Sequence, residues 1–262
     1  MRFPLILAAA FAVSVTDASA QTRPLATEEA HTAAAGTLVL EIGASALRDE
    51  PNFLTGAARD RWEGPELRLV YSPAANVELD ADWTARVGAR DDPDFGSVSD
   101  FGDITLRAKV KVAGSADGGG AMGLRFGVTL PQTSFGNGLG PNALRMSAQV
   151  LVSTAIGAAT LHLNGGVAIH DEPLRAHEQR DLFAFGIAMV QPFGPVTLAG
   201  EVAGLAGQGS PGADARSEAR GGIRVGRGVV RADVALRRGL TRAAGKWGIT
   251  AGLTWTLSSG AP

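Results

Sequence analysis

The sequence of 262 residues contains no cysteine, which excludes disulfide bridges and thiolate metal sites. It has no run of about 18 uninterrupted apolar residues, which excludes an ordinary membrane-spanning helix. Lysine and arginine number 24 against 26 acidic residues, and this net charge of −2 argues against nucleic acid as a partner. Aromatic residues make up only 6%, whereas the 35 glycines are close to double the usual share of about 7%. Such a chain can still enter a membrane if its apolar residues stand at alternate positions, as they do in transmembrane β-barrels.

Residues 1–20 have the three parts of a secretory signal peptide: a positive start, an apolar stretch and a small-residue cleavage site. We therefore expect the mature chain to lie outside the cytoplasm. Residues 21–36 show no periodicity and are predicted to form a flexible periplasmic leader. Residues 37–257 carry the regular pattern described next, and residues 258–262 are expected to be a short C-terminal tail.

The stretch VELDADWTARV, residues 77–87, alternates apolar and polar side chains with hardly a break. In an extended chain its two faces are Val77, Leu79, Ala81, Trp83, Ala85 and Val87 against Glu78, Asp80, Asp82, Thr84 and Arg86. In a helix the same residues would scatter carboxylates and aliphatic side chains around the axis. The period of two therefore predicts a strand with one apolar and one charged face.

The same alternation recurs along the chain and predicts about twelve strands. They are expected at residues 37–46, 66–71, 77–87, 103–112, 121–130, 143–153, 158–169, 181–190, 196–204, 217–225, 229–237 and 246–257. Most have the length of about 9–11 residues that a tilted strand needs to cross a bilayer. The ends of the second strand are poorly defined by the pattern.

The predicted connections alternate strictly between long and short, starting with long loops at 47–65 and 88–102. Outer-membrane barrels have this order, with long extracellular loops and short periplasmic turns. A water-soluble β-barrel or sandwich has no reason to separate its loops by length. We therefore predict an all-β fold, a single antiparallel transmembrane up-and-down β-barrel over residues 37–257, in the outer membrane of a Gram-negative bacterium.

The apolar faces of the predicted strands carry no charge in the clearest segments. An arginine or lysine there would cost about 2–4 kcal/mol at the bilayer midplane. Trp247 and Trp255 stand near the two ends of the last strand, and with Trp83 they are candidates for the aromatic girdles.

The opposite faces are charged and are expected to point into the lumen. The residues predicted to line it are Glu78, Asp80, Asp82, Arg86, Arg107, Lys109, Lys111, Arg125, Arg145, His162, Asn164, Glu201, Arg220, Arg224, Arg231 and Asp233. Opposite charges on neighbouring strands indicate an ion-pair ladder that supports the barrel. A charged constriction that selects solutes is the functional alternative, and the two interpretations are compatible.

Four segments resemble a known protein family in their order and spacing. They are FGDITLRAKVKV (101–112), GLRFGVTLPQTSFGNGLGPNALRMSAQVLVS (123–153), LHLNGGVAIHDE (161–172) and RRGLTRAAGKWGITAGLTWTL (237–257). The chain is similar over residues 37–257 to the MetA-pathway-of-phenol-degradation family, proteobacterial outer-membrane proteins often labelled transporters. Its members show a G-D-x-x-L-x-x-K strand, an L-P-T-rich loop with glycines and a closing W-G-x-x-x-G strand.

The resemblance implies a β-barrel that passes small compounds, often aromatic or hydrophobic ones. The implied partners are the lipid bilayer, the outer-membrane assembly machinery and a small-molecule solute. Two features depart from the family pattern. Gln132 follows Pro131 where threonine is usual, and the chain does not end on an aromatic residue, so Trp255 and Leu257 would have to serve as the assembly signal.

The sequence offers little enzymatic chemistry, and we expect neither a cofactor nor a metal. An outer-membrane hydrolase would need a positioned serine and base; His162 has Asn164 beside it, but Ser147 or Ser153 would have to come from a neighbouring strand. The glycine-rich stretch at 136–140 lacks the lysine and the helix of a phosphate-binding loop. We predict instead that its loop constricts the lumen, with Phe135, Gly136, Asn137 and Gly138 as candidates.

Two classes of function remain open. One is a passive, porin-like channel for small compounds with a charged lumen. The other is a structural, adhesive or receptor barrel whose lumen is plugged by its own ion pairs.

Overall fold

The computed structural model describes residues 23–114 and 119–258, except for the side chains of Arg227 and Ser258. The predicted signal peptide and the last four residues of the predicted tail lie outside the described residues. No helix in the described ranges is long and apolar enough to cross a membrane.

Nearly all described residues from Thr37 onward belong to strands or their connections. The elements are β1 (Thr37–Pro51), β2 (Ala58–Ala74), β3 (Val77–Thr84), β4 (Val87–Asp92), β5 (Gly96–Asp100), β6 (Ile104–Gly114), β7 (Gly120–Leu130), β8 (Arg145–Ile156), β9 (Ala159–Asp171), β10 (Gln179–Phe193), β11 (Val196–Ala206), β12 (Ser217–Arg227), β13 (Val230–Gly239), η1 (Arg242–Ala244) and β14 (Trp247–Ser258).

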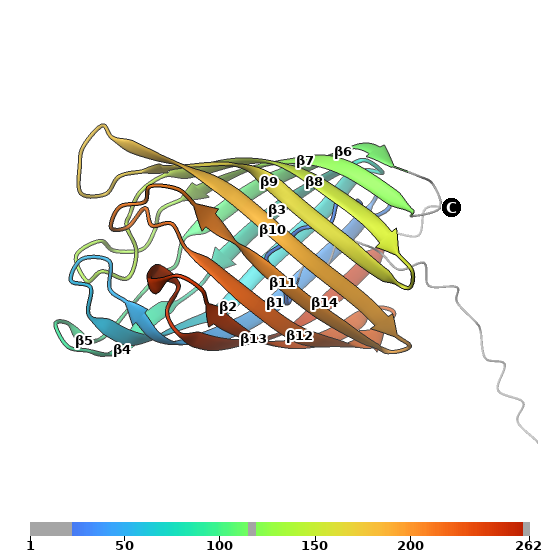
Figure 1. Ribbon diagram of the computed structural model, residues 1–262. Helices are drawn as coiled ribbons and strands as arrows, with labels where there is room; N and C mark the ends of the chain where they lie inside the picture. Colours follow the sequence, from blue (N-terminus) through green and yellow to red (C-terminus); the bar gives the residue numbers. More distant parts are fainter. Residues whose placement is uncertain (1–22, 115–118, 259–262) are drawn as a thin grey trace, which may run out of the picture.

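The strands form one closed antiparallel barrel (Figure 1). From β6 to β14 each strand pairs with the next one along the chain, and β1 closes the barrel by pairing with both β2 and β14. β3 and β4 follow each other along the same edge of β2, and β5 leads directly into β6. The fourteen segments therefore make twelve barrel strands, which confirms the predicted fold class. The end with the long loops is extracellular, and the end with the short turns is periplasmic.

The structure extends the second and third strands beyond their predicted ends. β2 begins at Ala58 rather than at residue 66, and the predicted loop 88–102 contains the β4–β5 hairpin. In this part of the barrel outward positions include charged side chains such as Asp60, which pairs with Arg48. Alternation of apolar and polar residues is lost where the strands rise above the lipid, so the pattern could not reveal these extensions.

Two assignments in the segment 77–87 are corrected. The strand breaks at residues 85–86, where the amide of Ala85 donates to the Pro65 carbonyl at 2.9 Å. Beyond this break the faces exchange. Val87, expected outside, is buried against Ala89 and Leu139. Arg86, expected in the lumen, is exposed, with its guanidinium carbon 4.8 Å from the centre of the Phe101 ring.

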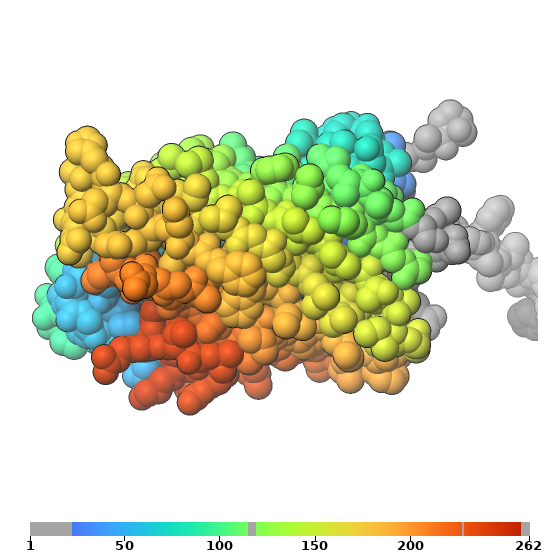
Figure 2. Space-filling view, turned by 45° about the horizontal axis from the view of Figure 1, so that its top comes forward, coloured from blue at the N-terminus to red at the C-terminus, as the bar shows by residue number. Residues whose placement is uncertain are grey.

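The barrel has its large apolar side chains outside and its charges inside. Outward residues such as Phe126, Ile187 and Leu236 are more than half exposed, whereas Glu78 and Lys109 are almost completely buried. Over the face shown in Figure 2 the side chains of neighbouring strands form a continuous wall. A water-soluble barrel would have the reverse arrangement. The closed barrel with an apolar exterior is an outer-membrane protein of a Gram-negative bacterium.

Substitutions at two adjacent residues of β6 test which side of the barrel wall faces the lipid. We expect Leu106→Arg, on the lipid face, to lower the free energy of unfolding by about 2–4 kcal/mol, or less if it lies near the interface. Thr105→Arg is the matched control, because Thr105 faces the lumen opposite Asp82, whose carboxylate can pair with the new charge. Urea unfolding in lipid vesicles measures both. Equal tolerance of the two substitutions would contradict the assigned faces.

Candidate functional site

The leader, described from Arg23 to Gly36, lies inside the barrel and not in the periplasm. Its backbone amides donate to side chains of the wall: Ala26 and Thr27 to the Glu201 carboxylate at 2.8 and 2.7 Å, and Ala30 to the Ser153 hydroxyl at 2.8 Å. The amide of Ala33 donates to Glu78 at 2.6 Å. The predicted flexible periplasmic leader is therefore replaced by an ordered segment that contacts strands on different sides of the lumen. Its lack of periodicity reflects contacts made to side chains rather than to a neighbouring strand.

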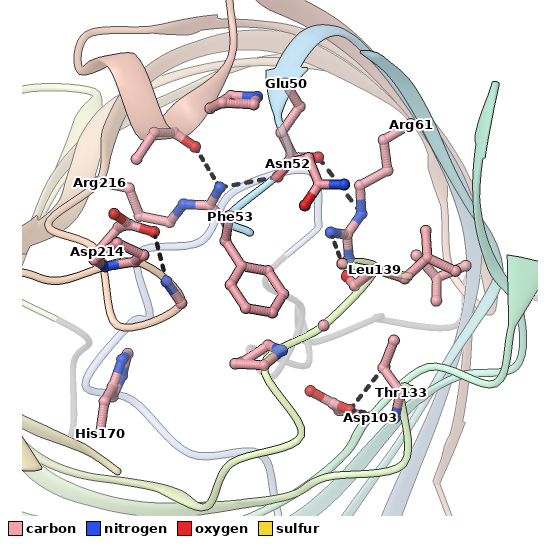
Figure 3. A pocket seen from close by; sticks show the side chains of 18 of the residues that line it. Glu50, Asn52, Phe53, Arg61, Asp103, Thr133, Leu139, His170, Asp214 and Arg216 are labelled. Atoms are coloured by element: carbon pink, nitrogen blue, oxygen red, sulfur yellow. Dashed lines mark hydrogen bonds and ion pairs between the residues drawn. The ribbon is translucent and has the colours of Figure 1, made fainter. Parts of the chain in front are cut away.

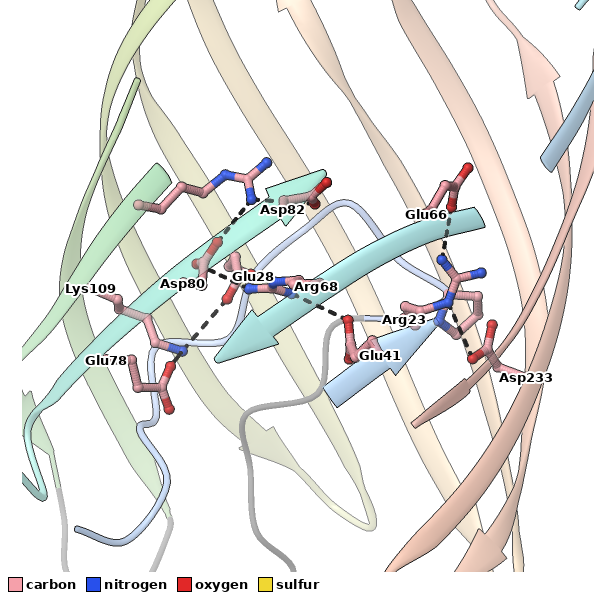
Figure 4. Close-up of polar contacts among 12 residues, drawn as sticks. Arg23, Glu28, Glu41, Glu66, Arg68, Glu78, Asp80, Asp82, Lys109 and Asp233 are labelled. Atoms are coloured by element: carbon pink, nitrogen blue, oxygen red, sulfur yellow. Dashed lines mark hydrogen bonds and ion pairs between the residues drawn. The ribbon is translucent and has the colours of Figure 1, made fainter. Parts of the chain in front are cut away.

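Glu28 of the leader is surrounded by three cations of the wall, and Figure 4 labels two of them, Arg68 and Lys109. Its Oε1 atom lies 2.7 Å from Arg68 Nη2 and 2.9 Å from Arg125 Nη2, and Oε2 lies 3.5 Å from Lys109 Nζ. The Glu28 side chain is 3% exposed and that of Lys109 is 2% exposed. We call these four residues the Glu28 cluster. Charges this deeply buried are stable only when paired, so the leader and the wall depend on each other.

The Glu28 cluster continues into a ladder along β2, β3 and β6. Asp80 lies between two arginines, 3.2 Å from Arg68 Nη2 and 2.9 Å from Arg107 Nη1. Arg107 also reaches Asp82 at 3.5 Å, and Glu78 pairs with Lys109 at 2.5 Å. These pairs join directly opposite or diagonal residues of neighbouring strands, as an ion-pair ladder requires.

Arg23 anchors the start of the described leader on the other side of the lumen. It contacts Glu66 at 2.9 Å and Asp233 at 3.5 Å, and it donates to the Thr250 hydroxyl and the Ala251 carbonyl, both at 2.9 Å. A guanidinium with this many partners holds the segment in one orientation.

Glycines of the wall make room for the leader. A Cβ atom added at Gly43 or Gly252 would lie 2.3 and 2.4 Å from atoms of the Arg23 side chain. At Gly186 it would lie 2.6 Å from Thr27 Oγ1. Part of the glycine excess in the composition is thus explained by a lumen that must accommodate a second layer of chain.

The remaining residues predicted to line the lumen lie on the inner side of the wall. Arg220 approaches Glu201 at 3.4 Å, Arg224 donates to the Arg23 carbonyl, and Asn164 donates to the Glu28 carbonyl at 2.8 Å. Lys111 and Arg231 are half-buried, and Arg145 pairs with Asp103.

Several residues of this interior were not found from the sequence. They are Arg23, Glu28, Glu41, Glu66, Arg68 and Glu218. The first two belong to the aperiodic leader, and Glu66 and Arg68 lie on the strand whose ends the pattern did not define. The alternation of charged residues in ELRLVY, residues 66–71, is the signal that could have revealed these two.

An open vestibule of about 720 Å³ lies above the leader at the extracellular end (Figure 3). The loop at residues 131–144, which holds the candidates for a constriction, forms part of its wall. Arg59 donates to the carbonyls of Asn137 and Gly138, and Arg61 donates to that of Leu139 at 3.0 Å. Phe135 packs edge-to-face on Phe53, with ring centroids 5.5 Å apart, while Gly136 has no neighbour that a Cβ atom would touch.

Asp103 fastens the other end of this loop. Burial alone would raise the pKa of its carboxyl, but Arg145 and the amides of Gln132 and Thr133 hold the pKa below its usual range. Oδ1 accepts from these amides at 3.0 and 3.1 Å and from the Thr133 hydroxyl at 2.9 Å. The charged form of Asp103 is therefore the form that holds the loop.

The structure brings Ser153 and His162 together, with Ser153 Oγ 2.8 Å from His162 Nδ1. Both side chains are nearly inaccessible, and the hydroxyl also accepts the amide of Ala30. The pair therefore connects the leader to the wall and is buried on the lumen side. Within the described ranges, no group of three or more histidine, aspartate or glutamate residues is arranged to hold a metal ion.

Solved structures share this fold. The COG4313 outer membrane channel from Pseudomonas putida F1 superposes with a TM-score of 0.68 over 87% of this chain and 97% of that chain, at 16% identity. The translocator domain of the autotransporter NalP from Neisseria meningitidis superposes with a TM-score of 0.50 over 84% and 88% of the two chains, at 12% identity. No protein-family model and no curated protein matches the sequence. These likenesses establish the fold of an outer-membrane barrel.

Two glycines of the vestibule loop provide a matched stability test. Gly138 has a φ of +68°, and a Cβ atom there would lie 2.0 Å from Asn52 Oδ1. We expect Gly138→Ala to release the loop and to cost at least about 1–2 kcal/mol. Gly136→Ala, in open space, should leave the loop in place. Limited proteolysis of the folded barrel measures loop release; equal cleavage of both variants would contradict the anchoring role of Gly138.

Proposed function

We propose that the protein is a passive outer-membrane channel for small compounds, such as aromatic or hydrophobic ones, and that the leader closes it in the conformation described. We further propose that it belongs to the MetA-pathway-of-phenol-degradation family suggested by its sequence motifs. The shared fold with the P. putida channel supports both proposals. The residues predicted to line the lumen, apart from Arg86, would line the solute path once the leader moves.

The observation that carries the proposal is the chemistry by which the leader is held. The leader is bound mainly through hydrogen bonds and ion pairs, including those of the Glu28 cluster and Arg23. Its apolar contacts form small clusters, such as Leu25 against Ala188 and Ala199. Polar contacts can be exchanged for water when the segment leaves, because the wall behind it is also polar. A polar lumen closed by a polar segment is what a gated aqueous path requires.

A barrel with a permanently plugged lumen is the second candidate, in a structural, adhesive or receptor role. The deep burial of Glu28, Lys109 and Glu78 favours it, because separating such charges is costly. We propose no enzymatic role, since Ser153 and His162 are covered by the leader. The partners we propose are the lipid bilayer, the outer-membrane assembly machinery and the solute.

Neutralising Glu28 tests the channel. Glu28→Gln leaves Arg68, Arg125 and Lys109 without their shared carboxylate, and breaking a buried pair of this kind costs about 3–5 kcal/mol. We expect more frequent and larger conductance steps in planar bilayers than for the unmodified protein. Glu178→Gln, in an exposed extracellular loop, is the control and should leave conductance unchanged. A folded Glu28→Gln barrel that stays silent would favour the plugged alternative.

A disulfide lock tests the movement of the leader directly. A Cβ atom at Gly186 would lie 3.3 Å from Thr27 Cβ, close to the separation of about 3.5–4.5 Å in disulfides. Because the chain has no other cysteine, Thr27→Cys with Gly186→Cys can form only this bridge. We expect the oxidised protein to lose solute flux in liposomes and a reductant to restore it.

The single variant Gly186→Cys should be insensitive to reductant. Flux through the oxidised double variant equal to its flux after reduction would show that the leader does not have to move.

A further inference from the structure

A basic and aromatic row lies on the outer surface of the barrel at its extracellular end. Trp247 of β14 is the direct partner of Arg48 on β1 and of Arg238 on β13. Residues directly opposite on neighbouring strands project to the same face, so one indole ring stands between two arginines. We call these three residues the Trp247 row.

The Trp247 row marks the upper edge of the apolar band. The outward residues two positions closer to the membrane centre on the three strands are Ala46, Leu236 and Ile249. Leu236 is 62% and Ile249 42% exposed, as expected of lipid contacts. Trp247 is itself 50% exposed, and the side chain of Arg48 is 58% exposed. A tryptophan at such a boundary lies at the level of the lipid headgroups.

The row carries positive charge that the described part of the chain does not neutralise. Arg238 is exposed and forms no ion pair with any residue that the structure describes. Arg48 pairs with Asp60, and the neighbouring Lys246, whose side chain is 66% exposed, lies 3.1 Å from Asp49. The Lys246 amide donates to the Arg48 carbonyl at 3.0 Å, which keeps this third cation beside the row. Three cations therefore face two carboxylates.

We propose that the Trp247 row binds the phosphorylated headgroup of an outer-leaflet lipid, the lipid A part of lipopolysaccharide. Arginine guanidinium groups bind phosphate oxygens in pairs of parallel hydrogen bonds. The indole of Trp247 packs on the sugar and on the start of the acyl chains, which follow the apolar surface of Leu236 and Ile249. The position at the edge of the apolar band selects a lipid over a soluble phosphate, because the acyl chains supply the rest of the contact.

The site is independent of the channel. It lies on the outer surface of β13, β14 and β1, whereas the leader contacts their inner side through Asp233, Thr250 and Arg23. Loss of lipid binding would leave the proposed gating intact, and a silent channel would leave the lipid site intact.

Binding is tested on the full barrel in uncharged detergent. Native mass spectrometry counts the copies of diphosphorylated lipid A bound to the unmodified protein and to Arg48→Gln/Arg238→Gln. Each basic residue near an anionic surface contributes about 1 kcal/mol, so we expect the double variant to bind at least about tenfold more weakly. The control, Arg90→Gln/Arg175→Gln, removes the same charge from exposed extracellular positions and should bind like the unmodified protein.

Two further binding measurements identify the ligand. Dephosphorylated lipid A should bind the unmodified protein as weakly as diphosphorylated lipid A binds the double variant. Inorganic phosphate at millimolar concentration should not displace lipid A. Equal binding by the double variant, or no preference for the phosphorylated lipid, would overturn the proposal. Full displacement by inorganic phosphate would also overturn it, by making the row a site for a soluble anion.

Discussion

Paired charges are buried in the lumen, and they can stay there only while each keeps its partner. Glu28, brought in by the leader, meets Arg68, Arg125 and Lys109 from three different strands of the wall. Without the leader, these cations would face each other with Glu41, Glu78 and Asp80 as the carboxylates of the described wall that pair with them. The buried cations of the wall therefore require either the Glu28 carboxylate or water molecules in its place.

This constraint explains several features that are unrelated in the sequence. Glycines such as Gly43 and Gly186 stand where the leader passes, and polar side chains such as Ser153 and Asn164 face its backbone amides. The wall is complementary to the leader, as a hydrophobic core is complementary to a buried side chain, but the contacts are hydrogen bonds instead of apolar ones. The segment can thus be held firmly and still be replaced by solvent.

The exterior obeys the opposite rule. In lipid, closure of the barrel lets every strand form its backbone hydrogen bonds with a neighbouring strand, and the outward side chains are apolar up to the headgroup level. At that level the Trp247 row begins, and the strands above it carry charged residues on both faces. The unpredicted extensions of β2 and β4–β5 and the reversal of faces at Val87 all lie in this upper part, where water replaces lipid as the surroundings.

The alternation of apolar and polar residues was sufficient to predict the barrel, its twelve strands and the orientation of nearly every strand within the lipid. A membrane penalises each charge on the wrong face, so the pattern with a period of two must be kept there. The course of the leader, the partners of Glu28 and Arg23, and the anchoring of the vestibule loop by Asn52 and Asp103 could be seen only in the folded barrel. These contacts join residues far apart in the chain, and they depend on which strands closure of the barrel brings together. Local periodicity contains no information of that kind.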